Sequence, residues 1–123
     1  MSTLRISGLF LLAMTVGSMV MPAAMATGNE VSPREGQAVF MTYCILCHGE
    51  SGEGDGRMAR LVEDPPPANL TVSTLSPLEV KRIITRGGEA IGRSASMPAW
   101  KDVIAEQELD NLVQFVMSLR ERP

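Results

Sequence analysis

Two cysteines and the single histidine of this chain fall within five consecutive residues, Cys44-Ile45-Leu46-Cys47-His48. The C-x-x-C-H spacing is the signature of covalent haem attachment. Two thiols at this spacing add across the two vinyl groups of the porphyrin, and the next imidazole then ligates the iron from the same side. Gly49 follows, where a side chain would crowd the ring. The motif predicts one haem c bound through Cys44 and Cys47, with His48 as an iron ligand.

Two other uses of these side chains are weaker. A disulfide between Cys44 and Cys47 would close a very small loop and would leave the adjacent histidine unexplained. A structural zinc site needs four protein ligands, and because the chain has no other Cys or His these would have to include carboxylates. Haem attachment accounts for both cysteines and the adjacent histidine, so we favour it over a redox disulfide and over zinc.

The first 26 residues have the pattern of a secretory signal peptide. Arg5 supplies a positive charge, residues 6–20 are largely apolar, and Ala24-Met25-Ala26 is an A-x-A cleavage pattern. The alternative is an uncleaved membrane anchor, but a bilayer span needs about 20 apolar residues. This run is shorter and is interrupted by glycine and serine. We expect a cleaved signal peptide over residues 1–26, export to the bacterial periplasm, and a single domain over residues 27–123 with no membrane span.

Residues 27–123 hold 10 of the 11 Lys and Arg residues and all 14 Asp and Glu residues, which gives a net charge of −4. An acidic protein is a poor candidate for nucleic-acid binding, which relies on basic surfaces. The charge favours a soluble protein that docks on a basic surface of its partner. A domain of this length has only a modest core, to which a covalently bound haem would add a large apolar group.

Helix start signals and apolar periodicity predict an all-α fold. Ser-Pro-x-Glu patterns at Ser32 and at Ser76 each supply an N-cap serine, a proline at the first helical position and a glutamate for a capping box. The first helix should run from Pro33 into the haem motif, and the second should end at Gly87-Gly88. A last helix over about residues 106–120 has the clearest helical period. Its apolar face consists of Leu109, Leu112, Val113, Val116 and Leu119.

The segments between these helices are predicted to be irregular. Residues 49–56 are rich in glycine and lack both a phosphate-loop ending and a calcium-loop ligand pattern, so they form a surface loop. Residues 57–62 form one or two helical turns, and three prolines at 65–67 impose an extended backbone. Residues 89–102 are irregular and contain Met97-Pro98-Ala99-Trp100.

Taken together, these features resemble the class I monohaem c-type cytochromes over nearly all of residues 27–123. Gly36, Phe40 and Cys44 follow one another at intervals of four, as in the first helix of that family. The resemblance implies the class I cytochrome c fold, in which about four helices surround one covalently attached haem. The first and last helices should cross closely at the glycine, with Phe40 packing against Leu112 and Phe115.

The resemblance also implies the surroundings of the iron. Residues 64–71 correspond to the segment beside the proximal histidine, where a proline carbonyl accepts the ring N–H, and Pro66 and Pro67 are both candidates. Met97-Pro98 resembles the Met-Pro ligand loop, so Met97 is expected to be the second axial ligand. A five-coordinate iron or a different ligand is the alternative. The other methionines of residues 27–123 are less favourably placed: Met41, Met58 and Met117.

Two departures from the family pattern limit what the resemblance implies. Ala105 occupies the start of the last helix, where Ser or Thr is common, at a cost of about 0.5–2 kcal/mol of capping. Only Lys81 and Lys101 are lysines after residue 26. A lysine ring around the haem edge is therefore absent, and partners of the mitochondrial type are not implied.

The function that the resemblance implies is electron transfer rather than catalysis. The protein would shuttle single electrons between redox partners such as a dehydrogenase, a reductase or a terminal oxidase, as a monomer or as a subunit of a larger complex. The alternative is a haem-based enzyme or gas sensor, peroxidase-like, with an open distal site. A peroxidase also needs a distal acid–base residue, and the only histidine, His48, is assigned to the proximal side.

Overall fold

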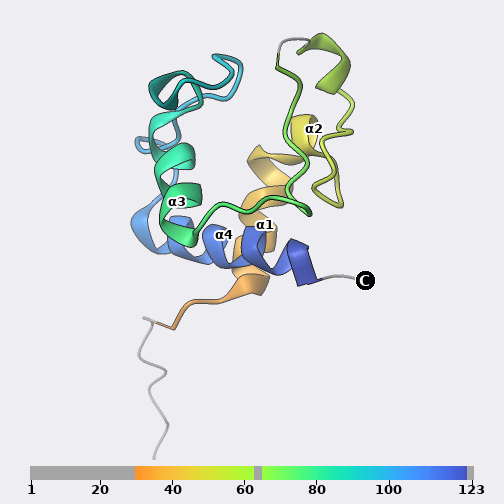
Figure 1. The fold of residues 1–123 in the computed structure, drawn as a ribbon. Helices are drawn as coiled ribbons and strands as arrows, with labels where there is room; N and C mark the ends of the chain where they lie inside the picture. Colours follow the sequence, from red (N-terminus) through yellow and green to blue (C-terminus); the bar gives the residue numbers. More distant parts are fainter. Residues whose placement is uncertain (1–29, 63–64, 122–123) are drawn as a thin grey trace, which may run out of the picture.

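The computed structural model describes residues 30–62 and 65–121, and in these ranges it is helical with no strand, as predicted. The signal peptide and the cleavage site expected within residues 1–26 lie outside the described residues. Figure 1 shows the arrangement of the helices and of three short 3₁₀ turns. The elements are α1 (Pro33–Tyr43), α2 (Ile45–His48), η1 (Ala59–Leu61), α3 (Pro77–Arg86), η2 (Glu89–Ile91), α4 (Glu106–Ser118) and η3 (Leu119–Glu121).

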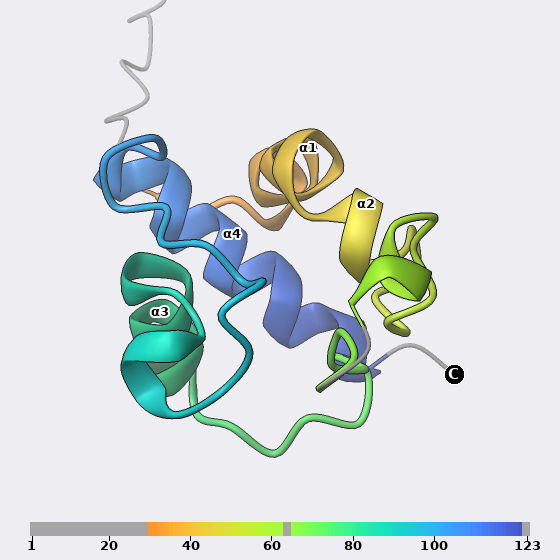
Figure 2. The ribbon, with the colours of Figure 1, turned by 90° about the horizontal axis from the view of Figure 1, so that it is seen from above.

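Helices α1 and α4 cross and form the most extensive contact between any two elements (Figure 2). Gly36 lies at the crossing, where a Cβ atom would overlap the carbonyl oxygen of Asn111. One turn further along α1, Phe40 packs on Phe115 of α4 with ring centroids 5.2 Å apart and ring planes at 55°. Both rings and Leu112 are fully buried or nearly so. The predicted glycine crossing with its aromatic packing is therefore confirmed.

Asn111 joins the two crossing helices through hydrogen bonds that the sequence did not suggest. Its side chain is only 2% exposed. The amide oxygen accepts from Ser32 N at 2.8 Å, and the amide nitrogen donates to the Glu35 carboxylate at 2.7 Å. Hydrogen bonds at both ends of the buried amide offset the cost of its desolvation and fix the two helices relative to each other. Asn111 precedes Phe115 by one turn on the same helix face, which is the signal that could have identified it.

The helix starts differ in how they are capped. At α3 the full capping box is present, since Ser76 N donates to Glu79 Oε2 at 2.7 Å and Glu79 N donates to Ser76 Oγ at 3.4 Å. At α1 the prediction of a full box is wrong, because Asn111 takes both the Ser32 N–H and the Glu35 carboxylate. At α4 the N-cap is an alanine, but its N–H donates to the Glu108 carboxylate at 3.0 Å.

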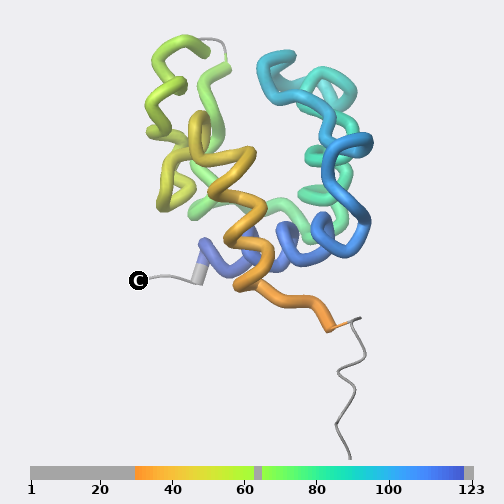
Figure 3. The backbone as a smooth tube through the Cα atoms, turned by 180° about the vertical axis from the view of Figure 1, so that it is seen from behind, coloured from red at the N-terminus to blue at the C-terminus, as the bar shows by residue number. Residues whose placement is uncertain are grey.

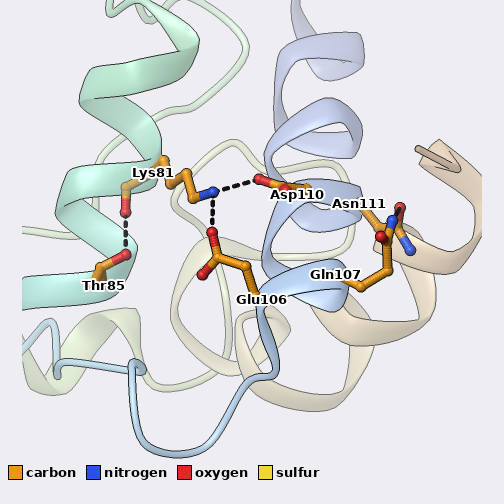
Figure 4. A network of polar contacts seen from close by, with 6 residues as sticks. All are labelled: Lys81, Thr85, Glu106, Gln107, Asp110 and Asn111. Atoms are coloured by element: carbon orange, nitrogen blue, oxygen red, sulfur yellow. Dashed lines mark hydrogen bonds and ion pairs between the residues drawn. The ribbon is translucent and has the colours of Figure 1, made fainter. Parts of the chain in front are cut away.

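Lys81 connects α3 to α4 (Figure 4). Its ammonium lies 2.6 Å from Asp110 Oδ1 and 2.5 Å from Glu106 Oε1. The hydrogen bonds to Asp110 and then to Glu106 raise the pKa of Lys81. The groups are partly exposed, so the ion pairs add little stability, and burial of Val80 and Ile84 on the same helix contributes more. Helix α4 thus contacts both α1 and α3, and it fixes the position of each.

Replacing Gly36 by alanine should destabilise the protein by about 1–3 kcal/mol, because the added methyl group must push α1 away from α4. The expected loss of stability is opposite to the effect of intrinsic helix preference, which favours alanine over glycine by about 1 kcal/mol. Guanidinium unfolding of the holoprotein measures the change. The exposed neighbour Gln37→Ala is the matched control and should stay within about 0.5 kcal/mol of the wild type. Equal stability of Gly36→Ala and Gln37→Ala would contradict the crossing geometry.

Candidate haem site

The C-x-x-C-H motif lies at the junction of α1 and α2. The prediction of a helix running into the motif holds as far as Tyr43. Cys44 is the C-cap of α1, with φ −112° and ψ −28°, and its N–H still donates to Phe40 O at 2.8 Å. The short helix α2 then carries Cys47 and ends at His48. Helices α1 and α2 meet at Cys44, and both cysteines and the histidine line the same cavity.

This cavity has a volume of about 550 Å³. Helix α2 and the loop after it lie on one side of the fold, while α3 and the loop after it lie on the other, with α1 and α4 between them (Figures 1 and 3). Residues of both sides line the cavity, and Phe40, Leu112 and Val116 from the crossing helices line its base. The site is therefore a largely apolar cavity with the motif on one wall.

His48 is oriented by a backbone carbonyl. Its Nδ1 lies 3.1 Å from Ala68 O, and because a carbonyl can only accept, Nδ1 carries the proton and Nε2 keeps the lone pair that can bind a metal. Burial lowers the pKa of His48, against a smaller opposing effect of this hydrogen bond. The imidazole is thus neutral at neutral pH and held in one tautomer.

The expectation that Pro66 or Pro67 supplies this carbonyl is wrong by one residue. The carbonyl of Pro67 faces Gly54, where a Cβ atom would overlap it. Gly54 N in turn donates to His48 O at 2.8 Å, which holds the glycine beside the motif. The next carbonyl, Ala68 O, is the one that lies within hydrogen-bond distance of the imidazole. Any residue can accept a hydrogen bond through its backbone carbonyl. The sequence therefore predicted which segment lies beside His48, but not which residue of it accepts the hydrogen bond.

The cysteine thiols do not have the properties of a redox pair. Burial, and to a smaller extent the neighbouring Cys47, raises the pKa of the Cys44 thiol to about 12. Disulfide exchange needs a thiolate, which catalytic C-x-x-C motifs obtain by lowering the pKa. Among the described residues there is also no cluster of three or more His, Cys, Asp or Glu side chains that could hold a metal ion. The raised pKa of the Cys44 thiol weakens the redox-disulfide alternative.

Met97 lines the cavity from the side of α3. Its backbone is fixed to the end of that helix, because Gly88 N donates to Met97 O at 2.9 Å and Trp100 N donates to Ile84 O at 2.9 Å. Met41 and Met117 pack against the core, as Met97 also does, but they are not among the described residues that line the cavity. Met58 also lines the cavity but belongs to the loop after α2, where its N–H bonds to Leu46 O at 2.8 Å. Met97 and Met58 thus reach the cavity from opposite sides.

An aromatic pair that the sequence did not predict closes one edge of the cavity. Tyr43, the last residue of α1, packs on Trp100 with ring centroids 5.1 Å apart and ring planes at 52°. Both side chains line the cavity. The pair connects the helix that carries the motif directly to the loop that carries Met97, and so limits how far the two sides can separate.

The fold and the cavity define a small c-type cytochrome, and comparisons with known proteins agree. The sequence model of the family "Cytochrome C oxidase, cbb3-type, subunit III" matches residues 31–116. The chain therefore belongs to this family of monohaem c-type cytochromes and has the class I cytochrome c fold. The family binds haem c covalently and takes part in electron transport, and the spacing of Cys44 and Cys47 fits that attachment.

Two similar proteins are longer than the region that they share with this chain. The cytochrome c subunit of alcohol dehydrogenase (quinone) from Gluconobacter oxydans (strain 621H) is 29% identical over 87 residues, which cover 66% of this chain and 17% of the relative. A solved chain of the reducing HAO-like protein complex of Kuenenia stuttgartiensis has 29% identity and a TM-score of 0.59, over 74% of this chain and 43% of the other. This chain thus corresponds to less than half of either relative.

The described residues fit the cofactor of the family. One wall offers two thiols at the required spacing and an imidazole whose Nε2 lone pair is available, and the rest of the cavity is mainly apolar. A flat apolar macrocycle with an iron centre needs this combination. In the ranges 30–62 and 65–121, no helix has the length and apolar character needed to cross a membrane.

Gly54→Ala should move the 67–68 segment away from His48, because the new methyl group would collide with the carbonyl of Pro67. We expect a loss of about 1–3 kcal/mol of stability and faster exchange of the His48 ring N–H, measured by NMR. Gly92→Ala is the matched control, since Gly92 also has a positive φ (71°) but a Cβ there meets nothing within 4 Å. If both variants leave exchange of the ring proton unchanged, the assigned support of His48 by Ala68 is wrong.

Proposed function

We propose that this chain is an exported electron-transfer protein in which one haem c is attached through Cys44 and Cys47 and ligated by His48 and Met97. The observation that carries the proposal is that a single apolar cavity has the motif on one wall and Met97 on the opposite side. Haem iron, when bound, alternates between the ferrous and ferric states and so lets the protein accept and donate one electron.

The two axial positions have different chemical roles. His48 offers Nε2, and the hydrogen bond from Nδ1 to Ala68 O fixes the ring and makes it a stronger donor. The thioether of Met97 is a soft and weaker donor, so it favours the ferrous state and raises the reduction potential relative to histidine alone. A His/Met pair in an apolar cavity suits a carrier of relatively high potential.

The base of the cavity is buried, whereas part of its rim is exposed to solvent. Phe40 and Leu112 are completely buried at the base, and the Tyr43–Trp100 pair covers one edge. Leu46 and Met58 line the cavity yet remain 36% and 40% exposed. An apolar interior disfavours the extra charge of the ferric state, and an exposed apolar rim allows a partner to approach closely enough for outer-sphere transfer.

We infer that residues 27–123 form one domain that works in the periplasm with a redox partner. The Gluconobacter relative is a subunit of a dehydrogenase, and the Kuenenia relative belongs to a multi-protein complex. These names support a role beside another redox protein, either as a free carrier or as a fixed subunit. The electrons would pass through this chain without a bond being made or broken, so the proposal assigns it no enzymatic activity.

Met97→Ala should open the distal position. We expect loss of the far-red sulfur-to-iron charge-transfer band, a lower reduction potential and rapid binding of carbon monoxide or cyanide. Met97→His should keep a six-coordinate iron but lower the potential. Optical titration of the holoprotein measures all of these changes. Met58→Ala and Met117→Ala are the matched controls and should retain the band.

Two results would count against this assignment. If Met97→Ala retains the band and the potential of the wild type, another side chain ligates the iron. If the wild type itself is high-spin and binds carbon monoxide at once, the distal site is open, and the haem-based enzyme or gas sensor replaces the carrier.

Export is tested by mass spectrometry of the periplasmic fraction. The chain should begin at Thr27 and carry the mass of one haem, because Ala24-Met25-Ala26 is the expected cleavage pattern. Ala26→Leu should block cleavage, since the site requires a small residue. Wild-type protein that keeps residues 1–26 and stays in the membrane fraction would make this segment an anchor and the protein a tethered carrier.

A further inference from the structure

Arg120 extends from the C-terminal end of α4, in the η3 turn, to the segment that precedes α3. Its Nη1 donates to Leu75 O at 2.7 Å, and its Nη2 donates to Ser73 Oγ at 3.3 Å. The two acceptors lie 45 and 47 residues before Arg120 in the sequence. The guanidinium therefore holds a distant segment of the chain against the end of the last helix.

The charge of this guanidinium is not neutralised by the described part of the chain. Both acceptors are neutral groups, and Nε is buried with no hydrogen-bond partner among the described residues. The ion pairs found among the described side chains involve Lys81 and Lys101, and none involves Arg120. The two hydrogen bonds to neutral groups therefore leave a positive charge next to the segment that they hold.

The segment that Arg120 holds is a wall of the cavity. Ser73, Thr74 and Leu75 all line it, so the cation lies directly behind residues that face the proposed haem. We propose that Arg120 is a positioning residue whose positive charge raises the reduction potential of the haem. This inference rests on the proposed function, because it concerns the redox equilibrium of the group bound in that cavity.

The sign follows from the charges of the two redox states. Ferric haem carries one more positive charge than ferrous haem, so a nearby fixed cation disfavours oxidation. In a partly buried environment, we expect removal of the charge to change the one-electron equilibrium constant about three- to tenfold. Tenfold corresponds to 59 mV for a one-electron couple.

The experiment compares reduction potentials of holoprotein variants by spectroelectrochemical titration at low salt and at about 1 M salt. Arg120→Gln removes the charge and keeps a hydrogen-bond donor, and it should lower the potential at both salt concentrations. Arg120→Lys keeps the charge and should stay close to the wild type. Arg34→Gln, which removes an exposed charge on α1, should have a small effect that vanishes at high salt.

Equal potentials of Arg120→Gln and wild type would overturn the proposal. So would an equal fall in Arg120→Gln and Arg120→Lys, since the effect would then come from a disturbed wall rather than from charge. The far-red band is recorded for every variant: its presence shows that Met97 ligation is intact, so failure of this inference remains distinct from failure of the proposed function.

Discussion

The close crossing of α1 and α4 is the constraint on which the rest of the structure depends. It requires Gly36, because any side chain there would overlap the backbone of α4. The same crossing places Phe40 over Phe115 and leads α1 to Cys44, at the wall of the cavity. Helix α3 is held against α4 by the ion pair of Lys81 with Asp110 and by its buried residues Val80 and Ile84. Both walls of the cavity are therefore positioned relative to a single helix.

Both proposed axial ligands are supported mainly by the backbone. Ala68 O holds His48 on one side, and the N–H of Gly88 holds the carbonyl of Met97 on the other. Glycines at these points let the chain approach closely, and the Tyr43–Trp100 pair connects the two sides. A site fixed in this way changes little when its charge changes by one electron. This rigidity, rather than any reactive side chain, is what the proposed electron transfer requires.

The sequence predicted the parts of this structure that have a residue signature. Helical periodicity, the Ser-Pro-x-Glu starts and the glycine at the crossing predicted the all-α fold, and the motif identified residues of one cavity wall. It could not give the register of the segment beside His48, because Ala68 acts through its backbone. It also missed Asn111 and Arg120, whose partners lie far away in the chain and become neighbours only in the fold.

Peptide mapping of the purified protein tests the central claim most directly. Trypsin should release residues 35–57 as one peptide that contains the motif, since no Lys or Arg lies between Arg34 and Arg57. The account predicts that this peptide carries the mass of one haem after acid–acetone extraction, with both Cys44 and Cys47 blocked to alkylation. A peptide with free or disulfide-bonded cysteines, and haem released into the solvent, would contradict it.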